Sequence, residues 1–115
     1  MINNVFLVGR LAQDPEMRYT EGGTAVTNFT IAVERDYKNK DGEKEVDFIP
    51  IVCWNKLAEI CGENLYKGRL VAVEGAIHIN KNKTEERTYV NTEIVARNVK
   101  FLDPKNKENN ADNNE

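Results

Sequence analysis

The sequence predicts an all-β protein, a five-stranded barrel with one short helix between its third and fourth strands. Three observations support this fold class. Five segments are rich in strand-forming residues, and most alternate with the two-residue period of a half-buried strand. Only one segment repeats its apolar residues at helical spacing. Glycine, proline and aspartate gather between these segments, where turns are expected.

The first two strands are expected over Val5–Leu11 and from Ala25 to about Glu34. Gly9 interrupts the side-chain pattern of the first strand and predicts a bulge or a bend there. Between the two strands, Asp14-Pro15 and the run Glu21-Gly22-Gly23 predict a link that is rich in turns.

The third strand is expected from Val46 to Trp54, after a polar hairpin segment that holds Asp41-Gly42. Its residues alternate between two faces. The face assigned to the core holds Ile49, Ile51 and Cys53, and the opposite face holds Phe48, Pro50, Val52 and Trp54. Because Pro50 has no amide hydrogen to donate, it should lie at a bulge or an unpaired edge.

The helix follows Asn55, a residue type favoured at helix N-caps, and Gly68 is placed to end it. Its apolar residues at helical spacing are Leu57, Ala58, Cys61 and Leu65. The fourth and fifth strands are expected over Leu70–Ile79 and Thr88–Leu102, joined by a loop around Asn80–Arg87. This order of elements is the one expected of an OB-fold barrel.

The chain of 115 residues has the length of one domain, which we place at residues 1–102. Residues 103–115 hold four acidic residues, two lysines and Ala111 as the one non-proline apolar residue. Such a segment cannot bury enough surface to offset the entropy of ordering it, so a disordered, acidic, Asn-rich tail is expected.

The overall net charge of −3 argues against nucleic-acid binding through bulk positive charge. The chain shows no signal peptide and no apolar run of the ~20 residues that cross a bilayer, so we expect a cytoplasmic protein without membrane contact. Two cysteines are too few for a secreted disulfide scaffold, and we expect both to be buried thiols.

Aromatic placement is the strongest functional signal. Phe48 and Trp54 point away from the predicted core, and Tyr37 lies in the polar segment before them. Aromatic side chains on the outer face of a sheet, with lysines beside them, suit stacking on nucleic-acid bases. Alternatively, these rings cover the far end of a curled sheet or pack against another subunit.

Cations gather around predicted loops and strand ends, where they could contact phosphates or form an ordinary solvated surface. They are Arg10, Arg18, Arg35, Lys38, Lys56, Lys67, Lys81, Lys83 and Arg87, and phosphate contact is assigned to all of them except Arg18. Lys38, Lys81 and Lys83 are favoured, because they lie on the two hairpin loops expected to flank a groove.

No catalytic, metal or cofactor site is expected. Cys53 and Cys61 are eight residues apart and His78 is the single histidine, which does not make a zinc site. Neither a nucleophile elbow, a Gly-rich phosphate loop nor a His-centred dyad is present.

The ordered motifs resemble those of bacterial single-stranded DNA-binding proteins over about residues 1–102. They are Val8-Gly9-Arg10-Leu11, Asp14-Pro15-Glu16, Arg18-Tyr19, Trp54-Asn55-Lys56-Leu57-Ala58-Glu59, Lys67-Gly68, Val73-Glu74-Gly75 and Thr92-Glu93-Ile94. The resemblance implies sequence-independent binding of single-stranded DNA in replication, recombination or repair, by a homotetramer associated with the nucleoid. It also implies stacking at Tyr37, Phe48 and Trp54, and phosphate contact at Lys56, Lys67 and Lys81. The alternative is an OB-fold module that binds protein instead.

The chain departs from the family pattern in its groove. Asn80-Lys81-Asn82-Lys83 lacks an aromatic that many members carry there, His78 and Asn80 stand where some carry arginines, and Pro50 replaces a cation. These differences imply that the protein binds DNA more weakly or wraps it differently. The tail lacks the Pro-Phe tip that docks replication and repair proteins, so such partners are not expected. A short paralogue, a phage-encoded protein acting in a host cytoplasm, or a truncated chain would each fit.

Overall fold

The computed structural model describes residues 1–103, apart from the side chain of Asn82, as six strands and one helix. They are β1 (Val5–Leu11), β2 (Glu16–Tyr19), β3 (Ala25–Lys38), β4 (Lys44–Trp54), α1 (Asn55–Asn64), β5 (Leu70–Lys83) and β6 (Thr88–Phe101). The tail predicted over 103–115 lies outside the described residues from residue 104 onward.

Five strands close a barrel in the order β1-β5-β6-β4-β3, because β1 pairs with β5 on one side and with β3 on the other. The remaining strand, β2, is short and pairs along the outer edge of β3. The single helix lies between β4 and β5 in the chain, which are the third and fourth of the five barrel strands. The predicted fold class is therefore confirmed.

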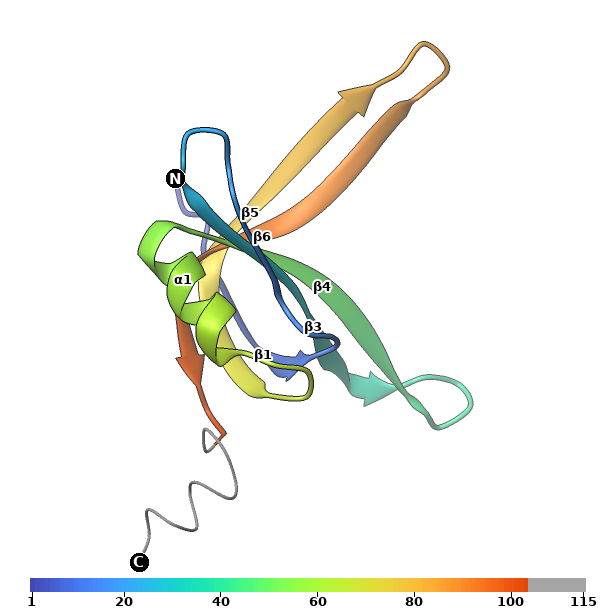
Figure 1. Ribbon diagram of the computed structural model, residues 1–115. Coiled ribbons are helices and arrows are strands. Elements are labelled where there is room, and N and C mark those ends of the chain that lie inside the picture. The colour runs from blue at the N-terminus through green and yellow to red at the C-terminus, as the bar shows by residue number, and fades with distance from the viewer. Residues whose placement is uncertain (104–115) are drawn as a thin grey trace, which may run out of the picture.

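The two long hairpins, β3–β4 and β5–β6, project from the barrel on the side away from α1 (Figure 1). Each hairpin extends past the core, where backbone pairing continues although the side chains are exposed. The sequence therefore underestimated these strands, because alternation fades where neither face is buried. As a result Lys38, Lys81 and Lys83 lie on strands near the hairpin tips and not in loops.

The core packs the inner faces of the barrel strands against α1. It contains Leu11, Ala25, Phe29, Ile31, Ile51, Cys53, Ala58, Cys61, Leu65, Val71, Val73, Ile94 and Ala96. The hydroxyl of Thr27 on β3 donates to the carbonyl oxygen of Ala58 on α1 at 2.6 Å, which ties the helix to the barrel. Cys53 and Cys61 are buried free thiols with their sulfurs 3.8 Å apart, as predicted. Their hydrogen bond and burial raise the pKa of the Cys53 thiol.

Three local predictions are wrong. Gly68 does not end the helix, because α1 ends at Asn64 and its C-cap is Leu65. The link between the first two strands contains β2, whose four residues are too few for alternation to register against the turn residues around it. Asn55 does not cap α1 through its side chain. The cap position is Trp54, and Asn55 instead has a φ of 60°, a left-handed conformation that asparagine tolerates better than most residues.

Pro50 lies where β4 has a partner on one side only. It is opposite Thr30 of β3, whereas the parallel pairing of β4 with β6 covers Ile51 and Val52 and does not reach it. The predicted unpaired edge at Pro50 is thus confirmed.

Gly9 marks the point where β1 passes close to β3. A Cβ atom added at Gly9 would collide with the carbonyl oxygen of Ala32, which is backbone and cannot move aside. By contrast, a Cβ atom added at Gly22, in the turn after β2, would meet nothing nearer than 3.9 Å.

We expect Gly9→Ala to lower the free energy of unfolding by about 1–3 kcal/mol, the usual cost of overpacking. Gly22→Ala, the matched control, should leave stability nearly unchanged. Urea unfolding of both variants measures the difference. Equal midpoints for the two variants would show that β1 and β3 do not approach as closely as described.

Candidate nucleic-acid interface

The outer face of β4 presents two exposed aromatic rings. Ile51 and Cys53 are buried, and the alternating positions leave Phe48 65% and Trp54 42% exposed. The outward orientation predicted from the sequence is therefore present. The two rings are six residues apart on one strand, about 20 Å at the rise of an extended chain. They cannot contact the same base and instead mark two ends of a track.

A groove runs beside this track, from the β5–β6 hairpin across β4 to β3 and β2. It consists of two hollows, of about 550 and 230 Å³, that share Pro50 and Glu93. The larger is also lined by Asn80, Lys81, Asn91 and Thr92. The smaller is also lined by Gln13, Asp14, Glu16, Asn28, Phe29, Thr30 and Ile51.

The groove is not basic. Among residues 1–103, Lys81 is the one cation lining the two hollows, and it is accompanied there by Asp14, Glu16 and Glu93. The amide of Asn80 donates to Glu93 at 3.1 Å. A ligand in this groove meets amides, hydroxyls and a proline ring more than it meets positive charge, so ring contacts must carry much of its binding.

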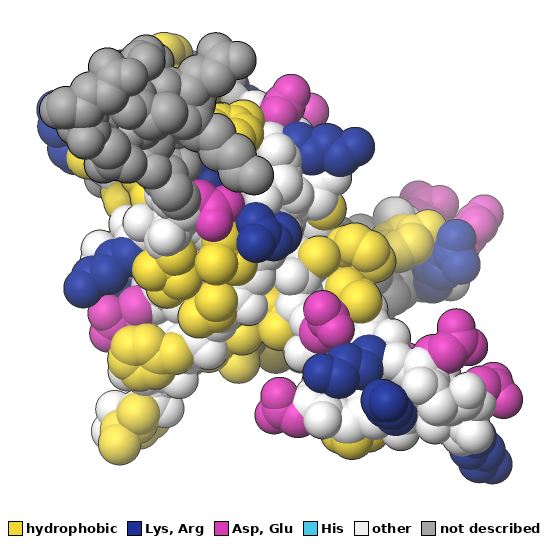
Figure 2. Space-filling view, turned by 90° about the horizontal axis from the view of Figure 1, so that it is seen from below, with side chains coloured by type: hydrophobic (Ala, Val, Ile, Leu, Met, Phe, Trp, Pro, Cys, Tyr) yellow, Lys and Arg dark blue, Asp and Glu magenta, His cyan; other side chains and the backbone are white. Residues whose placement is uncertain are grey.

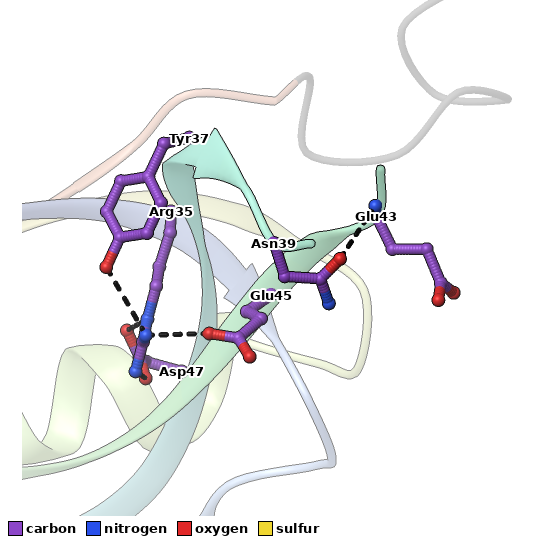
Figure 3. Close-up of polar contacts among 6 residues, drawn as sticks. All are labelled: Arg35, Tyr37, Asn39, Glu43, Glu45 and Asp47. Atoms are coloured by element: carbon purple, nitrogen blue, oxygen red, sulfur yellow. Dashed lines mark hydrogen bonds and ion pairs between the residues drawn. The ribbon is translucent and has the colours of Figure 1, made fainter. Parts of the chain in front are cut away.

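Arg35 on β3 is held by two carboxylates of β4 (Figure 3). Its Nε and Nη2 donate to Asp47 at 3.0 and 2.9 Å, and its Nη1 donates to Glu45 at 2.7 Å. The hydrogen bonds from Arg35 lower the pKa of Asp47. The charge of Arg35 is thus already compensated within the hairpin, which weakens its predicted role as a phosphate contact.

Tyr37 lies beside Arg35, whose Nη1 also donates to the Tyr37 hydroxyl at 3.5 Å (Figure 3). Asp47, which binds the same guanidinium, precedes Phe48 on β4, and successive side chains of a strand point to opposite faces. The structure therefore places Tyr37 and Phe48 on opposite faces of the β3–β4 hairpin, and it does not bring the three predicted aromatics onto one face.

The other predicted cations differ in their surroundings. Arg10 pairs with Asp103 at 3.1 Å and donates to the carbonyl oxygen of Gly68 at 2.9 Å. Asp103, assigned to the tail, thus contacts the barrel, and its carboxylate also accepts from the Leu70 amide. Five lysines are exposed and form no ion pair among residues 1–103, namely Lys38, Lys56, Lys67, Lys81 and Lys83.

Tyr89 is a further exposed aromatic residue, which the sequence patterns did not indicate. This residue lies on β6, is 42% exposed, and is directly opposite Asn82 of β5. Arg87 donates from Nε to the Tyr89 hydroxyl at 2.7 Å. The pairing register of β5 with β6 is the information that relates Tyr89 to the groove, and the sequence of β6 alone does not contain it.

Residues 2–102 match the model of the single-strand binding protein family. Single-stranded DNA-binding protein of Caldanaerobacter subterraneus subsp. tengcongensis is 54% identical over 107 residues, which cover 91% of this chain and 71% of that protein. Single-stranded DNA-binding protein A of Bacillus subtilis is 47% identical over 108 residues, with 92% and 62% covered. Single-stranded DNA-binding protein 1 of Staphylococcus aureus is 46% identical over 112 residues, with 96% and 71% covered.

Proposed function

The chain belongs to the single-strand binding protein family, and on that premise we propose that it coats single-stranded DNA without sequence preference and without catalysis. The observation that carries the proposal is the pair of exposed rings on β4, Phe48 and Trp54, beside an open groove. Every base offers a π-face to such a ring, so stacking does not depend on sequence. We expect the protein to serve replication, recombination or repair.

The proposed track begins at Trp54, passes Pro50 and the groove, and ends at Phe48. Pro50, exposed and without charge, offers an apolar surface to a sugar or a base. The free lysines near the track, foremost Lys81, contact phosphates. Tyr37 contacts the strand only where the DNA passes around the β3–β4 hairpin to its other face.

We propose the cytoplasm, with the DNA, as the place of action. Among residues 1–103, no helix is long and apolar enough to span a membrane.

We also propose that four copies assemble, through the surface of β1. Phe6 and Val8 on this strand are 70% and 54% exposed, beside a hollow of about 340 Å³. Figure 2 shows hydrophobic side chains gathered in the middle of the molecule's underside, and charges of both signs around the hairpin tip at lower right. Exposed apolar surface of this kind is typical of contacts between subunits.

The first of three predictions from the proposed function concerns Phe48. We expect Phe48→Ala to weaken binding to oligo(dT) by about 1–3 kcal/mol without loss of stability, because the ring is exposed. Trp54→Ala should weaken binding similarly but also lower the melting temperature, since Trp54 lies directly opposite the fully buried Val26.

Affinity is measured by fluorescence anisotropy of a labelled oligonucleotide, with Ile60→Ala on α1 as the control for loss of an exposed apolar side chain. If Phe48→Ala binds as tightly as the unchanged protein, β4 is not the binding surface.

The second prediction separates Lys81 from Arg35. Lys81→Gln should reduce the slope of log affinity against log salt by about 0.7, the value for one phosphate on a single strand. The double variant Arg35→Gln, Asp47→Asn should leave the slope unchanged, because that pair is already neutral as a unit. Titrations at several salt concentrations measure both slopes. The assignment of Lys81 is wrong if the two variants behave alike.

The third prediction concerns assembly. At micromolar concentration, sedimentation equilibrium should give about four times the chain mass of 13.1 kDa. Val8→Glu should reduce that mass, because it places a charge on the proposed apolar contact, whereas Glu34→Gln on β3 should not. If the unchanged protein sediments with the mass of a single chain, the proposed tetramer is wrong. DNA binding would then be tested separately.

A further inference from the structure

We propose that Tyr89, supported by Arg87, is a further stacking contact for single-stranded DNA near the tip of the β5–β6 hairpin. This inference rests on the proposed function and extends its track beyond β4. Between Ile77 and Glu93, Tyr89 is the one residue of the Phe, Tyr and Trp types.

Pairing registers place Tyr89 on the groove side of the hairpin. Val52 of β4 is paired with Val95 of β6, and their neighbours Ile51 and Ile94, also paired, point into the core. No register shift interrupts β6 between Val95 and Tyr89. Side chains of a strand alternate, so Tyr89 shares its face with Val95.

The larger hollow borders this stretch of β6, where Thr92 from the opposite face also lines it. Glu93 and Asn91, the two residues between Val95 and Tyr89 on that face, both line the larger hollow together with Pro50. Tyr89 is the next position on the same face, about 7 Å beyond Asn91 at the rise of a strand. A DNA strand that occupies the hollow and continues toward the hairpin tip therefore passes over the Tyr89 ring.

Arg87 holds the ring in place and leaves part of it open. Its Nε donates to the Tyr89 hydroxyl at 2.7 Å, and its guanidinium carbon lies 4.8 Å from the ring centroid. A ring fixed in this way loses less conformational entropy on binding, and 42% of the residue stays exposed to receive a base. The nearby cation also favours the approach of a phosphate.

Exposure alone does not distinguish Tyr89, since Tyr19 is more exposed at 59%. Tyr19 is paired with the core residue Ala25, and Met17, on the same face of β2, packs against the core. Tyr19 therefore points to the face opposite the groove. It is the matched control, a tyrosine of similar exposure on a strand that does not face the track.

The experiment titrates labelled oligo(dT) with the unchanged protein and with Tyr89→Ala, Tyr89→Phe and Tyr19→Ala. We expect Tyr89→Ala to bind about 5- to 150-fold more weakly, the range for loss of one stacked base. Tyr89→Phe keeps the ring and loses the hydroxyl, so its affinity should stay within about 5-fold of that of the unchanged protein. Tyr19→Ala should bind with the same affinity as the unchanged protein.

A second measurement covers the case in which Tyr89→Ala unfolds. An oligonucleotide carrying 5-iododeoxyuridine is irradiated with the unchanged protein, and mass spectrometry maps the crosslinked peptide. A crosslink at Tyr89 supports the inference. If the unchanged protein binds oligo(dT) but Tyr89→Ala binds equally well, or no crosslink falls on Tyr89, the inference is wrong while the proposed function stands. If the unchanged protein does not bind oligo(dT), both are wrong.

Discussion

The structure depends on closure of the barrel at β1, which pairs with β5 along its length and with β3 at its end. The closing pairs, Arg10 with Ala32 and Leu11 with Ile31, form only because Gly9 lets two backbones approach. Closure buries one face of every barrel strand and determines which face stays outside. The exposure of Phe48 and Trp54 is therefore a consequence of a contact made on the far side of β3.

Closure is incomplete on the other side of β4, and the candidate site lies there. The two paired positions between β4 and β6 leave the strands to diverge into separate hairpins. Pro50 suits this position because it needs no partner for an amide hydrogen. The resulting groove is lined by three carboxylates and one lysine, so its net charge does not attract DNA. Binding of DNA there must depend on ring contacts. Arg35 stabilises the hairpin, because its guanidinium forms ion pairs with Asp47 and Glu45.

Local patterns in the sequence predicted what depends on a single strand. Alternation along β4 was enough to place Phe48 and Trp54 outside, and the element order was enough for the fold class. Relations between strands could not be predicted in this way. The pairing of Arg35 with Asp47 shows that Tyr37 and Phe48 lie on opposite faces. The register of β5 with β6 places Tyr89 on the groove side. The free energy that selects these registers comes from core packing of residues distant in the chain, such as Ile51 and Ile94, and leaves no trace in one segment.

The burial of both cysteines has a practical consequence. Because Cys53 and Cys61 are enclosed between β4 and α1, the described surface carries no native thiol that a maleimide dye could reach. A single cysteine introduced at an exposed hairpin position, such as Lys40, would then be the one reactive group there. Distances between dyes on the protein and on DNA could be followed in the otherwise natural chain, without first replacing two residues of its core.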